Sequence, residues 1–213
     1  MKIYDITAAI SNNLPSYGDG ERHEITHPAQ MANGDSYNLS RISVSAHAGT
    51  HADTPLHFID GGASCADVDL AHFYGPAKVM RLAVNSHVCK ADLVNLDIQA
   101  GDIILLCTGQ SKYMSQGKFK QDFIALTPDA AEYLVEKKIK TIGMDYLSID
   151  PYKAPGFPAH KILLGSGVAV LEGLVLEGVP EGTYTLSALP LKIPNGEGSP
   201  VRAILVAEGT QNE

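Results

Sequence analysis

The sequence has no tryptophan and only three cysteines. Cys65, Cys89 and Cys107 are an odd number, and none of them belongs to a CxxC pair. Odd, widely spaced cysteines argue against a disulfide framework and against a cysteine-ligated zinc site. They are typical of a reducing compartment, so we expect a cytoplasmic protein that is stabilised by its core and not by cross-links.

Long apolar runs and basic clusters are also missing. No unbroken apolar run exceeds five residues, as in Ile103–Cys107, whereas a membrane span needs ~20. Asp5 stands where a secretory signal would carry its apolar stretch, so export is not expected. The 24 acidic residues outnumber the 16 Lys and Arg residues, for a net charge of −8. We therefore expect neither a membrane nor a nucleic acid as a partner.

What is present indicates one mixed α/β domain over residues 1–213. Hydrophobic residues make up 45% and charged residues 19% of the chain, which is ordinary for a globular protein. Short β-branched segments bounded by turn residues predict many strands. These segments are Ile3–Ile10, Tyr37–His47, Ala77–Val84, Asp102–Cys107, Thr141–Met144, Val168–Leu171, Tyr184–Leu189 and Val201–Val206. The pattern does not fix their order in a sheet.

One helix is well marked in the sequence. Thr127 can cap it, Pro128 suits its first position, and apolar residues follow at helical spacing up to Ile139. Segments 91–96 and 159–164 are weaker helical candidates. Few helices among many strands favour an α/β domain.

Histidine is concentrated in one place. Of eight histidines in 213 residues, His47, His51 and His57 fall within eleven residues. In an extended chain these three and Asp53 point to one face, because all are separated by even numbers. A straight strand would hold His47 and His51 about 13 Å apart, so the chain must turn between them, and Gly49 permits the turn.

This spacing favours a catalytic metal site. Two imidazoles and a carboxylate bind a divalent cation and leave coordination positions open for water. The alternative from the same residues is a polar strand end with solvated histidines. By contrast, His23, His27, His72 and His87 lack a partner at ligand spacing, and we expect them to be surface or core residues.

Further residues resemble a known family. The pattern resembles the signature of the metal-dependent cyclase-like hydrolases, which include the bacterial kynurenine formamidases; it consists of His47, Gly49, Thr50, His51, Asp53, Pro55 and His57. The resemblance covers essentially the whole chain. It extends to Asp5-Ile6-Thr7, Gly143-Met144-Asp145, Ser148, Asp150, His160, Glu172 and Pro200-Val201-Arg202-Ala203.

The resemblance implies a fold, an assembly and a metal centre. The fold would be a swivelling β/β/α domain, and the assembly a homodimer or homotetramer. Two divalent ions per chain, zinc or alternatively manganese, would be bound by His47, His51, Asp53, His160 and Glu172, with Asp53 bridging the two ions and Glu172 contacting both. Asp145 and Asp150 could orient ligand histidines, although Asp150 before Pro151 could equally serve a plain turn.

The implied activity is metal-dependent hydrolysis of an aryl formamide such as N-formylkynurenine, a reaction of tryptophan catabolism. Metal-activated water would attack the substrate, and His57 would be the catalytic acid and base. Tyr17 stands where the kynurenine formamidases carry a substrate-binding tryptophan, within Leu14–Gly20. This departure keeps two alternatives open: hydrolysis of an isatin-like cyclic amide, or a metal- or ligand-binding module without catalysis.

Overall fold

A sheet that is buried on both faces forms the centre of the fold. The computed structural model describes residues 1–18, 23–115, 117 and 119–207. Its central strands are β5 (Tyr74–Arg81), β6 (Ile103–Cys107), β7 (Thr141–Met144) and β8 (Ala169–Glu172), which are parallel. Antiparallel strands extend the sheet on both sides; they are β1 (Lys2–Asp5), β4 (His51–Asp53), β9 (Gly182–Ser187), β10 (Gly198–Pro200) and β11 (Ile204–Ala207). The order is β1-β11-β9-β5-β6-β7-β8-β4-β10.

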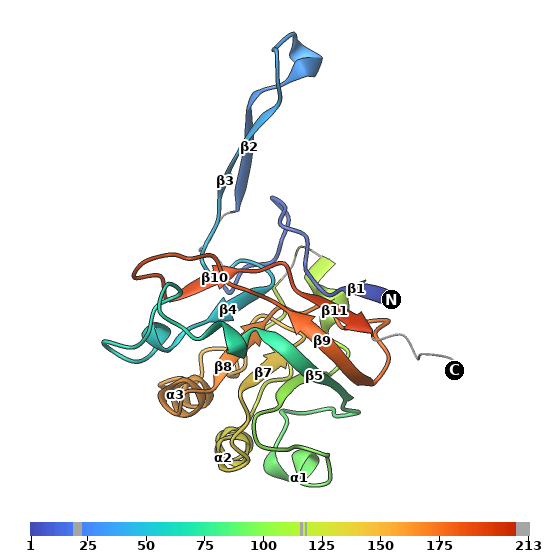
Figure 1. Cartoon of the computed structure of the whole chain (residues 1–213), viewed down its shortest axis with the longest axis vertical. Coiled ribbons are helices and arrows are strands. Elements are labelled where there is room, and N and C mark those ends of the chain that lie inside the picture. The colour runs from blue at the N-terminus through green and yellow to red at the C-terminus, as the bar shows by residue number, and fades with distance from the viewer. Residues whose placement is uncertain (19–22, 116, 118, 208–213) are drawn as a thin grey trace.

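Three helices cover one face of this sheet (Figure 1). They are α1 (Lys90–Leu93), α2 (Pro128–Glu136) and α3 (Pro158–Gly165); single 3-10 turns occur at Met31–Asn33, Pro55–His57, Leu70–His72 and Ser111–Ser115. In β6, Ile104 and Leu106 pack with the helices, whereas Ile103 and Leu105 join a second apolar cluster on the opposite face. Each such fully buried side chain contributes roughly 1.5–3 kcal/mol. The expected mixed α/β class is confirmed.

Most predicted segments contain an element of the structure, including β5, and the weaker helical candidates 91–96 and 159–164 overlap α1 and α3. β6, β7, β8, β9 and β11 lie within or beside predicted segments, but the first predicted strand ends at Asp5 and the 37–47 segment ends at Ser43. β4 and β10 were not predicted. Each has three residues and no β-branched side chain, so their strand conformation comes from pairing with neighbours rather than from propensity.

α2 begins as expected with Pro128 at its first position. The role expected for Thr127 is wrong: it occupies the N-cap position, but its hydroxyl makes no capping bond. The hydroxyl hydrogen-bonds instead to the Val88 carbonyl and to the Asp129 carboxylate, at 3.0 and 2.6 Å. No helix of the described residues combines the length and apolarity needed to cross a membrane.

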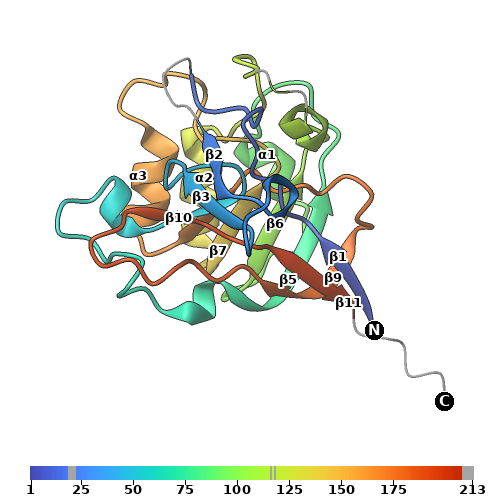
Figure 2. The same ribbon diagram turned by 90° about the horizontal axis from the view of Figure 1, so that it is seen from above.

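A two-stranded hairpin stands away from the rest of the molecule. β2 (Glu24–Ala29) and β3 (Leu39–Ser43) pair antiparallel in a sheet of their own. Figure 1 shows this hairpin rising from the sheet body on the side where β10 lies, and Figure 2 looks along it. We call residues 24–43 the arm.

Candidate metal centre

β4 places the first two candidate ligands. Alternate residues of a strand project to the same face, so His51 and Asp53 point together. β4 lies between β8 and β10, and its antiparallel register sets His51 directly opposite Glu172. Opposed residues of an antiparallel pair are side-chain neighbours. His51 Nε2 accordingly lies 3.2 Å from Glu172 Oε2.

A tight turn brings His47 to the same face. Gly49, at φ 62°, forms this turn as expected. The turn packs against Gly173, at φ 66°, where a Cβ atom would lie 2.1 Å from the Gly49 carbonyl oxygen. Because Gly173 has no side chain, the two segments can touch. His47 Nδ1 thereby comes within 2.8 Å of Asp53 Oδ1.

α3 supplies the third histidine. The Asp150 carboxylate accepts hydrogen bonds from the backbone N–H groups of Ala159 and His160, at 2.9 and 3.0 Å, and so caps this helix. The same carboxylate lies 2.6 Å from His160 Nδ1 and orients the ring. His160 Nε2 then lies 3.1 Å from Glu172 Oε1 and 3.4 Å from Asp53 Oδ2.

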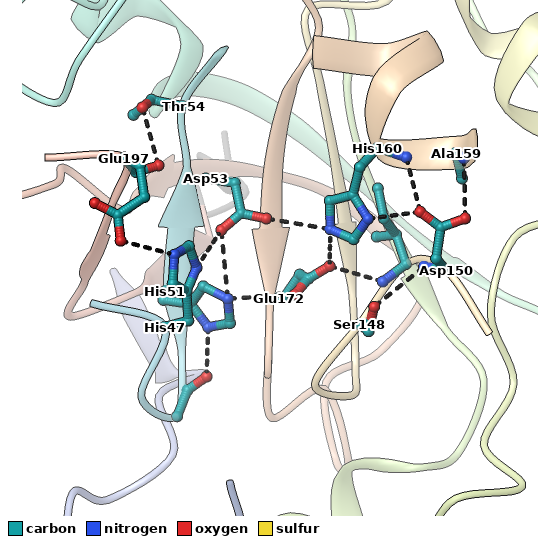
Figure 3. Close-up of polar contacts among 12 residues, drawn as sticks. His47, His51, Asp53, Thr54, Ser148, Asp150, Ala159, His160, Glu172 and Glu197 are labelled. Carbon is teal, nitrogen blue, oxygen red and sulfur yellow. Dashed lines mark hydrogen bonds and ion pairs between the residues drawn. The ribbon is translucent and has the colours of Figure 1, made fainter. Parts of the chain in front are cut away.

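These five residues form two donor groups that share Asp53 (Figure 3). One group is His47, His51 and Asp53, the other is Asp53, His160 and Glu172, and the ligand atoms within each lie within 4.8 Å of one another. Asp53 Oδ2 is buried and makes no hydrogen bond to any part of the chain that the structure describes. Imidazole nitrogens and carboxylate oxygens in such a cluster fit a divalent cation such as zinc or manganese.

Burial and mutual contact control protonation in this centre. Burial alone lowers the pKa of His51, but the hydrogen bond to Glu172 and the charge of Asp53 outweigh burial and raise this pKa to about 9. Burial and Asp53 raise the pKa of Glu172, but its contacts with His160 and His51 outweigh them and lower it. Without a cation, protonated imidazoles therefore compensate the buried carboxylates. A divalent cation replaces these protons when it binds.

His57 is separate from both donor groups. Its ring stacks on His47, with the centroids 4.1 Å apart. Burial, reinforced by the charges of His47 and His160, lowers the pKa of His57 to about 4 against the opposing carboxylates. At pH 7 its imidazole is therefore neutral and able to accept a proton.

The centre opens into a cavity of about 350 Å³. Its lining residues come from five separate parts of the chain: Tyr17, His47, His51, His57, Phe58, Leu147, Ser148, Phe157, His160 and Glu172. Tyr17 faces this cavity, and its hydroxyl accepts a hydrogen bond of 2.9 Å from the Lys153 N–H. Asp19 and Gly20, which belong to the stretch expected to shape the pocket, lie outside the described residues.

Each of the three candidate ligand histidines has its outward nitrogen next to an oxygen atom. For His51 and His160 the contact is a hydrogen bond, which fixes the tautomer and the ring orientation of a ligand, whereas His47 Nε2 has only an ion-pair distance to its oxygen. The contacts are His160 Nδ1 with Asp150 at 2.6 Å, His51 Nδ1 with the Gly49 carbonyl at 2.9 Å, and His47 Nε2 with Glu197 Oε1 at 3.3 Å.

The structure shows which of the two aspartates expected to orient ligand histidines does so. Asp150 orients a histidine, so the first of its two expected roles is present. Asp145 does not do so: its carboxylate accepts hydrogen bonds from Thr108, Gly109 and Gln110, which shapes the loop after β6. Glu197 was missed, because nothing local links it to a histidine 150 residues earlier. Phe58 and Phe157 were also missed, because only the tertiary structure shows that their side chains line the cavity.

Other histidines lie outside the centre, as expected. His27 is exposed and contacts Ser40, whereas His72 Nδ1 bonds to the Lys140 carbonyl. His87 Nδ1 accepts a hydrogen bond from the Ala125 N–H. His23 is buried.

A mixed α/β fold with a buried imidazole and carboxylate centre at the base of a cavity is the architecture of a metal-dependent hydrolase. The comparisons with known proteins give the family. Residues 4–151 match the family Cyclase, described as "Putative cyclase". This match includes His47, His51, Asp53 and His57, and the chain belongs to the cyclase family.

Relatives and solved structures agree over nearly the whole chain. A kynurenine formamidase of Polaromonas naphthalenivorans is 37% identical over 96% of this chain and 91% of its own. A kynurenine formamidase of Geobacillus thermodenitrificans is 34% identical over 94% and 95%. The structure titled as a potential metal-dependent hydrolase with cyclase activity superposes with a TM-score of 0.85 at 37% identity, over 98% and 99% of the two chains. Isatin hydrolase A of Labrenzia aggregata superposes with a TM-score of 0.83 at 26% identity, over 97% and 94%. The fold expected from the resemblance is confirmed.

Proposed function

We propose that this protein hydrolyses the carbon–nitrogen bond of an aryl formamide, N-formylkynurenine or a close analogue, with two divalent metal ions per chain. The observation that carries the proposal is one cavity that joins two donor groups sharing Asp53, a neutral His57, and aromatic side chains at Tyr17, Phe58 and Phe157. The kynurenine formamidase relatives support the choice of an aryl formamide.

Each of the two donor groups would bind one ion. His47, His51 and Asp53 would hold the first, and His160, Glu172 and Asp53 the second, with zinc favoured by the nitrogen-rich set. When bound, such ions lower the pKa of water and polarise a carbonyl oxygen. The aromatic side chains would seat the aryl ring and exclude bulk water.

His57 would move the proton. Its neutral imidazole takes a proton from the attacking water as the new carbon–oxygen bond forms. It then gives this proton to the amine nitrogen as the carbon–nitrogen bond breaks, which yields an arylamine and formic acid; the acid releases its proton to solvent and becomes formate. Such a group typically contributes roughly 10²–10⁴-fold. The pKa of about 4 leaves the imidazole neutral at pH 7, which is the protonation state that the first of these transfers requires.

A second candidate substrate is an isatin-like cyclic amide. The isatin hydrolase superposes over 97% of this chain, and an aromatic cavity accommodates a planar bicyclic ring. Turnover by the zinc-loaded protein should be compared for N-formylkynurenine, formanilide, an aliphatic formamide and isatin. We expect the largest kcat/KM with an aryl formamide; a preference for isatin would favour the second candidate. No turnover of any of the four would favour a binding module without catalysis.

Tyr17 is proposed to contact the aryl ring. Stacking contributes about 0.5–1.5 kcal/mol beyond burial, so Tyr17→Ala should lower kcat/KM for formanilide roughly tenfold through KM. Tyr17→Trp should raise relative activity on N-formylkynurenine, since it enlarges the aromatic surface. Equal losses on formanilide and on an aliphatic formamide would show that Tyr17 does not face the ring.

A further inference from the structure

One hydroxyl group of the cavity wall is buried and has an unused hydrogen-bond donor. Ser148 lines the cavity, and only 3% of its surface is exposed. Its Oγ accepts a hydrogen bond of 3.2 Å from the Asp150 N–H (Figure 3). A serine hydroxyl has one donor and two acceptor positions, and within the described parts of the chain no group accepts the Ser148 O–H. This O–H is therefore available to a molecule that binds in the cavity.

The backbone around Ser148 is fixed by contacts with the second donor group. The Ile149 N–H donates a hydrogen bond of 2.7 Å to Glu172 Oε1, and the Asp150 carboxylate lies 2.6 Å from His160 Nδ1. His57 lies nearer the first donor group, because its ring centroid is 4.1 Å from that of His47 and 5.9 Å from that of His160. Ser148 and His57 therefore flank the centre from different donor groups. A molecule that spans the centre can contact both.

The rest of the cavity wall is aromatic or apolar. Apart from the candidate ligands and His57, the lining residues are Tyr17, Phe58, Leu147, Ser148 and Phe157. Tyr17 also carries a hydroxyl, but its oxygen accepts the Lys153 N–H and its side chain is only half-buried, so water can accept its O–H. The cavity of about 350 Å³ lies at the small end of the range for ligand sites, roughly 300–1,000 Å³, which suits a substrate with a single ring. In such a site one fixed donor decides how a flat ring is oriented.

The two candidate substrates share an acceptor that this donor can recognise. In N-formylkynurenine a ketone is attached to the ring carbon ortho to the formamide nitrogen, and in isatin a ketone is attached at the corresponding carbon. In the formamide, the ketone oxygen can accept the N–H of the same molecule, which holds the group in the plane of the ring. A carbonyl oxygen has two lone pairs, so one remains for the Ser148 O–H. Formanilide has no such group.

We propose that Ser148 determines substrate specificity by donating a hydrogen bond to a carbonyl group ortho to the nitrogen of the scissile bond. The preferred substrates are then aryl amides with an ortho carbonyl group, rather than aryl formamides in general. This inference rests on the proposed function and adds a substrate-binding residue to it. The recognised carbonyl does not react, so the contact strengthens binding and moves no proton.

Two isomers of one substrate isolate this contact. Both ortho- and para-formamidoacetophenone carry an acetyl group conjugated with the nitrogen, so their amines leave with similar ease, but only the ortho isomer presents the carbonyl beside the nitrogen. We expect the ratio of kcat/KM for the ortho isomer to that for the para isomer to fall about 2–10-fold in Ser148→Ala, the size of one neutral hydrogen bond. The change should lie mainly in KM, because the lost contact is present in the ground state and in the transition state. Ser148→Thr, which keeps a hydroxyl, should retain most of the ratio.

The ratio also separates a substrate contact from a structural role. Ser148→Ala removes the acceptor of the Asp150 N–H, and any resulting change at His160 or in bound metal lowers kcat/KM for both isomers alike. Equal losses on the two isomers would therefore overturn the proposal. Loss of the ratio in Tyr17→Phe but not in Ser148→Ala would assign the donor to Tyr17 and would also overturn it.

Binding of the product amines tests the same contact without turnover. Calorimetry on the zinc-loaded wild type should show tighter binding of ortho-aminoacetophenone than of para-aminoacetophenone, and Ser148→Ala should reduce this difference. Equal affinities of the wild type for the two amines overturn the proposal, even where Ser148→Ala does not fold. If neither formamide isomer is hydrolysed, the proposed function fails, and the binding comparison still decides whether Ser148 recognises the ortho carbonyl.

Discussion

At the scale of single residues, Asp53 contributes one carboxylate oxygen to each donor group. Its side chain is completely buried, and contacts with His160, His47 and His51 outweigh burial and hold its pKa well below the usual range. A buried carboxylate that contacts three imidazoles is a group of ligands suited to a divalent cation. His57 lies beside the two donor groups but belongs to neither, so its role can be distinguished from that of a ligand by substitution.

His57 and His51 should respond differently to truncation. His57→Ala should keep most bound metal and lose roughly 10²–10⁴-fold in kcat, because it removes a proton carrier and no ligand. His51→Ala should lose metal and activity together. Elemental analysis beside steady-state kinetics measures both. If His57→Ala empties the centre of metal, His57 belongs with the ligands.

Glu197 should act on the metal through His47. Its carboxylate lies 3.3 Å from His47 Nε2, while His47 Nδ1 faces Asp53. Loss of such an outer partner typically costs 10–100-fold in metal affinity, so Glu197→Ala should lower zinc affinity by about that factor, and Glu197→Gln by less. Competition with a chromophoric chelator measures the affinity. Glu136→Ala, which removes an exposed acid of α2 that pairs with Lys90, is the control and should bind zinc normally. Equal affinities in all variants would contradict this role.

At the scale of elements, the centre is built where β4 and β8 meet. Pairing of these strands sets His51 against Glu172, and the Gly49 turn contacts Gly173 directly after it. Short strands without β-branched residues have little tendency to form alone. The pairing of β4 with β8 and the contact between Gly49 and Gly173 therefore stabilise each other.

Two glycines with similar backbone angles allow this contact to be tested. Gly173 has φ 66° and no room for a Cβ atom, whereas Gly178 has φ 78° and nothing within 4 Å of one. Gly178→Ala should lose only the cost of a left-handed residue, about 1–3 kcal/mol. Gly173→Ala should lose more, and should also bind less metal. Urea unfolding and elemental analysis measure the two effects; equal losses of stability would show that the close approach to Gly49 is unimportant.

At the scale of the whole molecule, apolar clusters on both faces of the sheet stabilise the fold. This stabilisation does not require a cation at the centre, although His51, Asp53, His160 and Glu172 are themselves buried. Removal of metal should therefore abolish activity while the protein stays folded. A loss of the cooperative thermal transition on chelation would instead make the site structural.

The metal-free protein should show a distinctive dependence on pH. The pKa of His51 is raised from 6.5 to about 9 in the folded state, and that of His160 is also raised, since carboxylates outweigh its burial. The folded state then binds protons more tightly than the unfolded state. The resulting stability is complete below pH 6.5 and is lost as the pH rises through about 9.

The unfolding free energy of the chelated protein should accordingly fall between pH 6.5 and about 9. The zinc-loaded protein should lack this decline, because its imidazoles bind the cation in the neutral form. Urea titrations across this range check the prediction. A flat profile for the chelated protein would contradict it.

Much of the fold can be predicted from the sequence. Apolar runs such as Ile103–Cys107 and the Pro128 start of α2 act locally, through side-chain pattern and backbone restriction, so they predict elements that the structure contains. In the arm, β3 lies within the predicted segment 37–47 but β2 could not be predicted, and neither could β10. A strand that contains Pro28 and a three-residue strand carry no local signal of that kind.

The sequence by itself determined the cluster of His47, His51 and Asp53, because these residues lie within one segment of seven residues. The turn at Gly49 brings His47 back, and the alternation of side chains along a strand points His51 and Asp53 to the same face. It brought in His160 and Glu172 only by resemblance. The tertiary structure decided the rest: strand order placed Glu172 opposite His51, α3 carried His160 to the shared carboxylate, and β10 set Glu197 against His47. These contacts join residues up to 150 positions apart, and only chain packing brings such residues together.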